Sequence, residues 1–101
     1  MSATPQTFTS GSVTSTGVIC SLGVEGSKLP TGVLVGGTFV GTAKVEVSDN
    51  PEAGSPTWTQ YGADLTAPGT VEISIPVKAV RVRCSAYTSG TVEAYIGTPV
   101  P

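Results

Sequence analysis

Residues 70–96 decide the fold class, and they read TVEISIPVKAVRVRCSAYTSGTVEAYI. Apolar residues alternate with polar ones through three successive runs, which is the period of a half-buried β-strand. The apolar positions are Val71, Ile73 and Ile75, then Val80, Val82, Cys84 and Ala86, then Val92, Ala94 and Ile96. We therefore expect antiparallel strands in this region, each with one face turned to a core.

Turns at Val77–Lys78 and Thr88–Gly90 would join the three runs into a C-terminal three-stranded meander. In that register every inward residue meets another inward residue, as an antiparallel pair requires. The same register places Glu72 opposite Arg83 as a cross-strand ion pair.

The remainder of the chain is also typical of β structure. It is rich in Val and Thr, which pack well on a pleated surface, and its 13 Gly and 8 Pro would interrupt helices. We expect an all-β, single antiparallel β-sandwich or barrel-like domain over residues 13–101. The expected first strand is Val13–Leu22, broken or bulged at Gly17. Residues 1–12, with Phe8 as their one aromatic, are predicted to be an extended N-terminal arm.

Composition excludes several functional classes. Charged residues make up only 12% of the chain and the pI is near 4.8, so no basic surface for nucleic acid is expected. No apolar run is long enough to span a membrane, and the start of the chain lacks the features of a signal peptide. We expect a protein that is made in a cytoplasm, stays soluble, and has neither nucleic-acid nor membrane partners.

Catalysis and cofactor binding are not expected. The chain has no His, which removes the commonest bases and metal ligands. Asp49, Glu52 and Asp64 fall in expected loops, but without the dense spacing of a calcium loop. We predict no catalytic, cofactor or metal residues. Cys20 and Cys84 are expected to be free, buried thiols, with a single bridge as the alternative.

The candidate partner-binding residues are Arg81, Arg83, Tyr87 and Tyr95 on the outer face of the meander, together with Phe8 as an anchor on the arm. Arg and Tyr are common at the centres of protein interfaces. An ordinary solvated sheet face explains the meander residues equally well. Asp49 is expected to cap a turn, and Trp58 to pack into the core.

The run GTFVGTAKVEVSD at residues 37–49 is followed by Thr57–Trp58, by AVRVR at residues 79–83 and by YTSGTV at residues 87–92. This order of turns and strands resembles small virion proteins of tailed phages over roughly residues 37–97. The resemblance implies a non-enzymatic decoration or cement protein that binds the outside of an assembled capsid, or a small fibre component. Its partners would be the major capsid protein or other virion subunits, its location the virion, and its oligomeric state a homo-oligomer, expected to be a trimer.

Two other classes of protein stay open. A receptor- or carbohydrate-binding module of a phage head or tail fibre would expose Trp58, Tyr61 or Tyr87 as a stacking platform. An immunoglobulin-like adhesion domain would form a Cys20–Cys84 disulfide.

Overall fold

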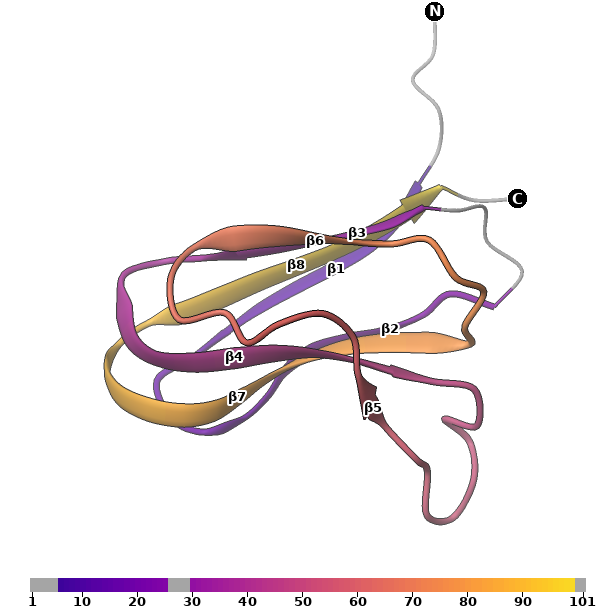
Figure 1. The fold of residues 1–101 in the computed structure, drawn as a ribbon, viewed down its shortest axis with the longest axis horizontal. Coiled ribbons are helices and arrows are strands. Elements are labelled where there is room, and N and C mark those ends of the chain that lie inside the picture. The colour runs from indigo at the N-terminus through magenta and orange to yellow at the C-terminus, as the bar shows by residue number, and fades with distance from the viewer. Residues whose placement is uncertain (1–5, 26–29, 100–101) are drawn as a thin grey trace, which may run out of the picture.

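The computed structural model describes residues 6–25 and 30–99, and within these ranges the chain contains β-strands joined by turns and loops, with no helix. Eight strands form two four-stranded antiparallel sheets that pack face to face as a sandwich (Figure 1). Sheet A consists, in spatial order, of β1 (Gln6–Val13), β8 (Val92–Pro99), β3 (Thr31–Gly36) and β6 (Gly69–Ile73). Sheet B consists of β2 (Gly17–Gly23), β7 (Ala79–Gly90), β4 (Phe39–Ser48) and β5 (Thr59–Gln60). The predicted all-β sandwich is confirmed.

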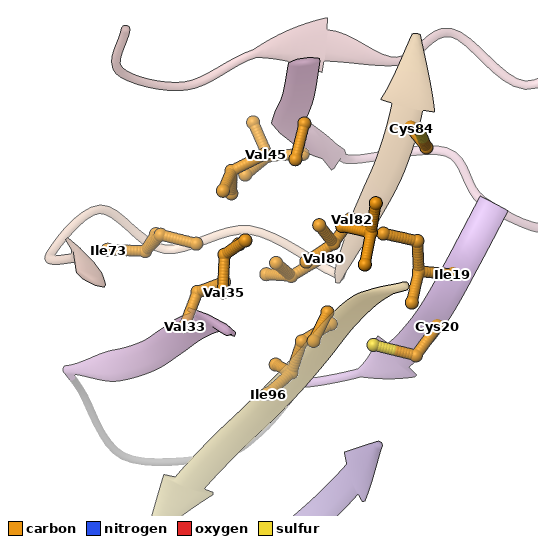
Figure 2. Packing of buried hydrophobic residues seen from close by; sticks show 14 of the residues in the cluster. Ile19, Cys20, Val33, Val35, Val45, Ile73, Val80, Val82, Cys84 and Ile96 are labelled. Atoms are coloured by element: carbon orange, nitrogen blue, oxygen red, sulfur yellow. The ribbon is translucent and has the colours of Figure 1, made fainter. Parts of the chain in front are cut away.

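The core lies between the sheets and is built mainly from valine. Val is stiff at χ1 and packs densely on a pleated surface, so short strands can fill the space between two sheets. Figure 2 shows the side chains of both sheets pointing toward one another. The buried cluster comprises Ile19, Cys20, Val24, Val33, Val35, Ala43, Val45, Val47, Ile73, Val80, Val82, Cys84, Val92, Ala94 and Ile96.

The predicted meander is wrong, although most of its predicted inward residues face the core. The exceptions are Ile75 and Ala86, which are exposed. β6 pairs with β3, β7 pairs with β2 and β4, and β8 pairs with β1 and β3. The segment after β6 crosses to the other sheet, where the Lys78 N–H donates to the carbonyl oxygen of Ser48 at 3.0 Å and the Lys78 carbonyl accepts from Val24 at 2.9 Å. These bonds and Pro76, which has no N–H to donate, prevent a tight hairpin at Val77–Lys78.

The N-terminal segment is part of the sandwich. Residues 6–12 were predicted to be an arm, but they form most of β1, which pairs with β8 from Gln6↔Pro99 to Val13↔Val92. Met1–Pro5 lie outside the described residues. The predicted interruption at Gly17 is present, but the two sides of it belong to different sheets: the chain leaves sheet A after Val13 and enters sheet B at Gly17, whose φ of 136° favours glycine.

Candidate interaction faces

The five predicted partner-binding residues do not share one surface. Arg81 and Arg83 lie on the outer face of sheet B, which we call face B. Phe8 and Tyr95 lie on the outer face of sheet A, which we call face A. Because β7 and β8 belong to different sheets, the thickness of the sandwich separates the two pairs.

Tyr87 belongs to neither outer face. β7 carries an extra residue between its pairs with Ala43 and Thr42, so the alternation reverses after Cys84. Tyr87 consequently packs against the core, and its hydroxyl donates to the Gly90 carbonyl at 2.6 Å. The prediction that Tyr87 faces outward with the arginines is therefore wrong.

Face B is organised around one buried carboxylate, Glu46 of β4, which is 7% exposed. The Arg81 Nε donates to Glu46 Oε1 at 2.7 Å. Arg83 approaches in a fork, with Nε on Oε1 and Nη2 on Oε2, both at 3.2 Å. The predicted Glu72–Arg83 pair is not formed, because Lys44 and Glu46 of β4, and not β6, lie beside the arginines. Burial alone would raise the pKa of Glu46, but the bonds from Arg83 and Arg81 outweigh it and lower the pKa.

Trp58 lies on face B and not in the core as predicted. The Arg81 guanidinium sits 4.3 Å from the centre of the Trp58 ring, a cation–π contact. The ring is half-buried under this contact. Tyr61, which was also considered for a carbohydrate-stacking platform, packs against the core. Trp58, Tyr61 and Tyr87 therefore do not form an open stacking platform.

The remaining charges of face B are also paired with each other. Lys44 Nζ contacts Asp64 Oδ1 at 3.0 Å and the Gln60 side-chain oxygen at 3.3 Å. Gln60 in turn donates to Asp64 at 2.7 Å. Hydrogen bonds from Gln60 and Lys44 lower the pKa of Asp64. The cations of this face are thus held by acceptors of the same chain.

Face A has a different character. The rings of Phe8 and Tyr95 stack with their centres 5.7 Å apart and their planes at 23°. Leu34 lies opposite Tyr95 on the neighbouring strand. Phe8 is 60% exposed and Leu34 49% exposed. Together Phe8, Tyr95 and Leu34 form a row of apolar side chains across three strands, which we call the apolar strip.

Glycines, which have no side chain, lie next to the apolar strip. Gly32 and Gly97 are cross-strand partners, and Gly97 is also opposite Phe8. The Tyr95 ring lies over Gly97, where a Cβ would come within 2.9 Å of the ring. Shallow hollows flank the strip on both sides, and both are lined by Leu34 and Tyr95.

Each hollow contains one exposed carboxylate. Glu93 lines the hollow beside Gly36, and Glu72 lines the hollow beside Gly32. In the described part of the chain neither carboxylate makes an ion pair. None of the four strands of sheet A contains Lys or Arg.

The sequence reasoning missed Glu46, Leu34 and the glycine pair. Glu46 could have been found from the sequence, because it is the one acidic residue in its strand and lies among outward polar positions. Leu34 alternates outward from Val33 and Val35, but a single apolar residue at an outward position is common on protein surfaces. The glycine pair depends on the β3–β8 register, which only the fold provides.

Other sites expected from the sequence carry structural roles. Both cysteines are free and buried, as predicted, and burial raises the pKa of the Cys20 thiol. The turn after β4 is capped by Asn50 and not by the predicted Asp49, since Asn50 Oδ1 accepts from the Thr57 N–H at 3.0 Å and from the Ser48 hydroxyl at 3.0 Å. Residues 6–25 and 30–99 hold no cluster of metal-ligating side chains and no helix able to cross a membrane.

Comparison with known proteins identifies a shared fold. The chain is similar to the crystal structure of the SPBc2 prophage-derived protein YomS, with a TM-score of 0.67, 16% sequence identity, and coverage of 97% of this chain and 98% of that one. A second solved structure, from Bacillus endospore appendages described as disulfide-linked pili, aligns with a TM-score of 0.40 and 9% identity. No protein-family model and no curated protein matches the sequence. The first similarity shows that the two chains share a fold.

Proposed function

We propose that this chain is a non-enzymatic structural protein of a tailed phage particle, which binds the outside of the assembled capsid and stabilises it. The observation that carries the docking role is the apolar strip of Phe8, Leu34 and Tyr95 on face A. Exposed apolar patches with polar surroundings mark sites of interaction, and aromatic side chains supply much of the binding energy of such sites.

Two observations support the phage setting. The sequence resembles small virion proteins over residues 37–97, and the fold is similar from end to end to that of a prophage-derived protein. The weak net charge of −2 also gives copies little mutual repulsion, which suits a subunit displayed many times on one shell.

Stabilisation would follow from mass action. A protein that binds the assembled shell and not its dissociated subunits stabilises the shell by about 2.7 kcal/mol per site when its free concentration is 100-fold above Kd. Many equivalent sites multiply this effect. On this proposal, copies would form trimers set on threefold or quasi-threefold positions of the shell, where a closed symmetric contact can form.

Co-sedimentation of the purified protein with emptied heads of its phage tests the proposal. We expect saturable binding in fixed proportion to the shell subunits. Phe8→Ala combined with Leu34→Ala should weaken binding by roughly tenfold or more, because both side chains would be buried at the contact.

The matched control replaces two exposed apolar residues outside face A, Val18→Ala with Val40→Ala, and should bind as the original protein does. Light scattering of the free protein gives its oligomeric state. Failure to bind heads, together with pelleting on bacterial envelopes or polysaccharide, would replace the decoration role by receptor binding.

A further inference from the structure

We infer that the partner surface of face A is basic, with two Arg or Lys side chains placed on either side of an apolar centre. This inference rests on the proposed docking role and names the chemistry of the partner. It follows from how charge is distributed between the two faces of the sandwich.

Charge on face A has a single sign. The strands of sheet A contain Glu72 and Glu93 and no Lys or Arg. Both carboxylates are exposed and, within residues 6–25 and 30–99, take part in no ion pair. A partner that covered them with apolar or acidic groups would leave two charges desolvated, so a favourable partner must supply cations.

The shape of the hollows favours long cationic side chains. In both hollows the walls beside the carboxylate are formed by Leu34 and Tyr95. The aliphatic stem of Arg or Lys can lie against these apolar walls while its head reaches the carboxylate. Arg suits the site better, since its planar guanidinium stacks on an aromatic ring and pairs with a carboxylate through two bonds.

Sheet geometry fixes the spacing of the two cations. Glu72 lies opposite Gly32, and Glu93 lies opposite Gly36 on the other side of β3. The two carboxylates are therefore offset by four residues along β3 and by two strand spacings across the sheet. This offset places the Cα atoms of Glu72 and Glu93 about 16 Å apart. The partner's cations should be separated by a comparable distance, with an apolar group between them to meet Tyr95 and Leu34.

A second copy of this chain is a poorer occupant than a different protein. Among described residues, the cations are Lys44, Arg81 and Arg83 of sheet B and the exposed Lys78 just before β7. Lys78 is in no ion pair of the described residues, but one lysine can meet only one of the two carboxylates. The two arginines are held by Glu46 and Lys44 is held by Asp64, at distances of 2.7–3.2 Å. Binding face A to face B would require breaking these pairs, so the cations are assigned to a site on the shell.

The test measures binding to emptied heads of the phage at low and high salt. The face A variant carries both Glu72→Lys and Glu93→Lys. The control variant carries both Glu25→Lys and Glu52→Lys, which make the same change in net charge at exposed positions beside Lys78, away from face A. We expect the face A variant to bind roughly tenfold or more weakly than this control at low salt. The difference should shrink at about 0.5 M salt, where charges are screened over a few ångströms.

Equal binding by the two variants, or tighter binding by the face A variant, would overturn the inference and leave the docking role intact. Failure of the original protein to bind heads would instead remove the proposed function. Self-association of the free protein in light scattering, abolished by Glu72→Lys with Glu93→Lys, would identify a second copy as the occupant and also overturn the inference. Circular dichroism of each variant establishes that it is folded.

Discussion

The two outer faces of the sandwich use their polar groups in opposite ways. On face B, Glu46 is buried and takes three hydrogen bonds from Arg81 and Arg83, with Trp58 packed over Arg81. On face A, exposed Phe8 and Leu34 share the surface with carboxylates that make no ion pair in the described ranges.

This difference shows that charged residues on a sheet do not by themselves mark a binding site. The arginines that look like interface residues in the sequence are occupied by an internal acceptor, so their main contribution is to hold β7 beside β4. Face A offers groups whose interactions are incomplete, and incomplete interactions are what a partner can satisfy.

Removing the acceptor of face B should have the largest effect on stability. Glu46→Ala leaves two half-buried guanidinium groups side by side without a counter-charge, which should destabilise the protein by about 2–3 kcal/mol. Urea unfolding followed by Trp58 fluorescence measures this. A loss below about 0.5 kcal/mol would mean that face B is not held by this network.

Acid should weaken the ion pairs that Glu46 makes on face B. The pKa of Glu46 is lowered from its usual value near 4.5, so below that value the unfolded chain takes up the proton more readily than the folded one. The stability that Glu46 contributes is therefore complete above pH 4.5 and is lost as the pH falls through the lower folded value. As the pH is lowered through this range, the urea concentration at the unfolding midpoint should decrease for the original protein and should decrease less for Glu46→Gln. Parallel curves for the two proteins would contradict this assignment.

Trp58→Ala should have the next largest effect, about 1–2 kcal/mol, because it removes both the cation–π contact and the cover over Arg81. Thermal unfolding followed by circular dichroism gives the value. Iodide should quench Trp58 fluorescence only in part, as its ring is half-buried. Complete quenching at the diffusion limit would show that the contact with Arg81 is not kept in solution.

On face A, Gly97→Ala should change binding more than stability. The new Cβ would meet the end of the Tyr95 ring, which can swing aside, so we expect a loss of stability of only about 1 kcal/mol or less. Displacing this ring disturbs its stack with Phe8, and binding to heads should weaken. Gly23→Ala, where a Cβ would meet nothing within 4 Å, is the control. Unchanged binding by Gly97→Ala would place the contact elsewhere.

Neutralising the carboxylates of face A should have the smallest effect on folding. Glu72→Gln and Glu93→Gln should each change the free energy of unfolding by less than about 0.5 kcal/mol, as expected for exposed residues outside a network. Urea unfolding of these two variants and of Glu46→Gln under the same conditions compares their free energies of unfolding. An effect as large as that of Glu46→Gln would show that face A is also structural.

Much of the fold could be predicted from local pattern. The inward positions were predicted correctly in β6, in β7 as far as Cys84, and in β8. Ile75, which follows β6, is exposed, and so is Ala86, because the extra residue in β7 reverses the alternation after Cys84. The pairing of strands could not be predicted in this way. The register that joined Ile73 with Val82 matched apolar residues well, but the two belong to opposite sheets.

The candidate site was predicted in part. Phe8 and Tyr95 were both named from the sequence, and the structure brings them into one stack. Arg81 and Arg83 were named as interface residues, yet their acceptor lies 35 and 37 positions earlier in the chain. No local spacing connects residues so far apart, because only strand pairing places them together.

The sequence by itself determined an all-β domain with valine-rich inner faces and a nearly uncharged surface. Alternation is a local property, since each side chain's direction follows from the pleat of its own strand. The tertiary structure alone decided which strands are neighbours, which sheet each aromatic residue joins, and which charges find partners. An inward residue meets apolar neighbours whether they lie beside it in one sheet or across from it in the other, so alternation is satisfied by both arrangements.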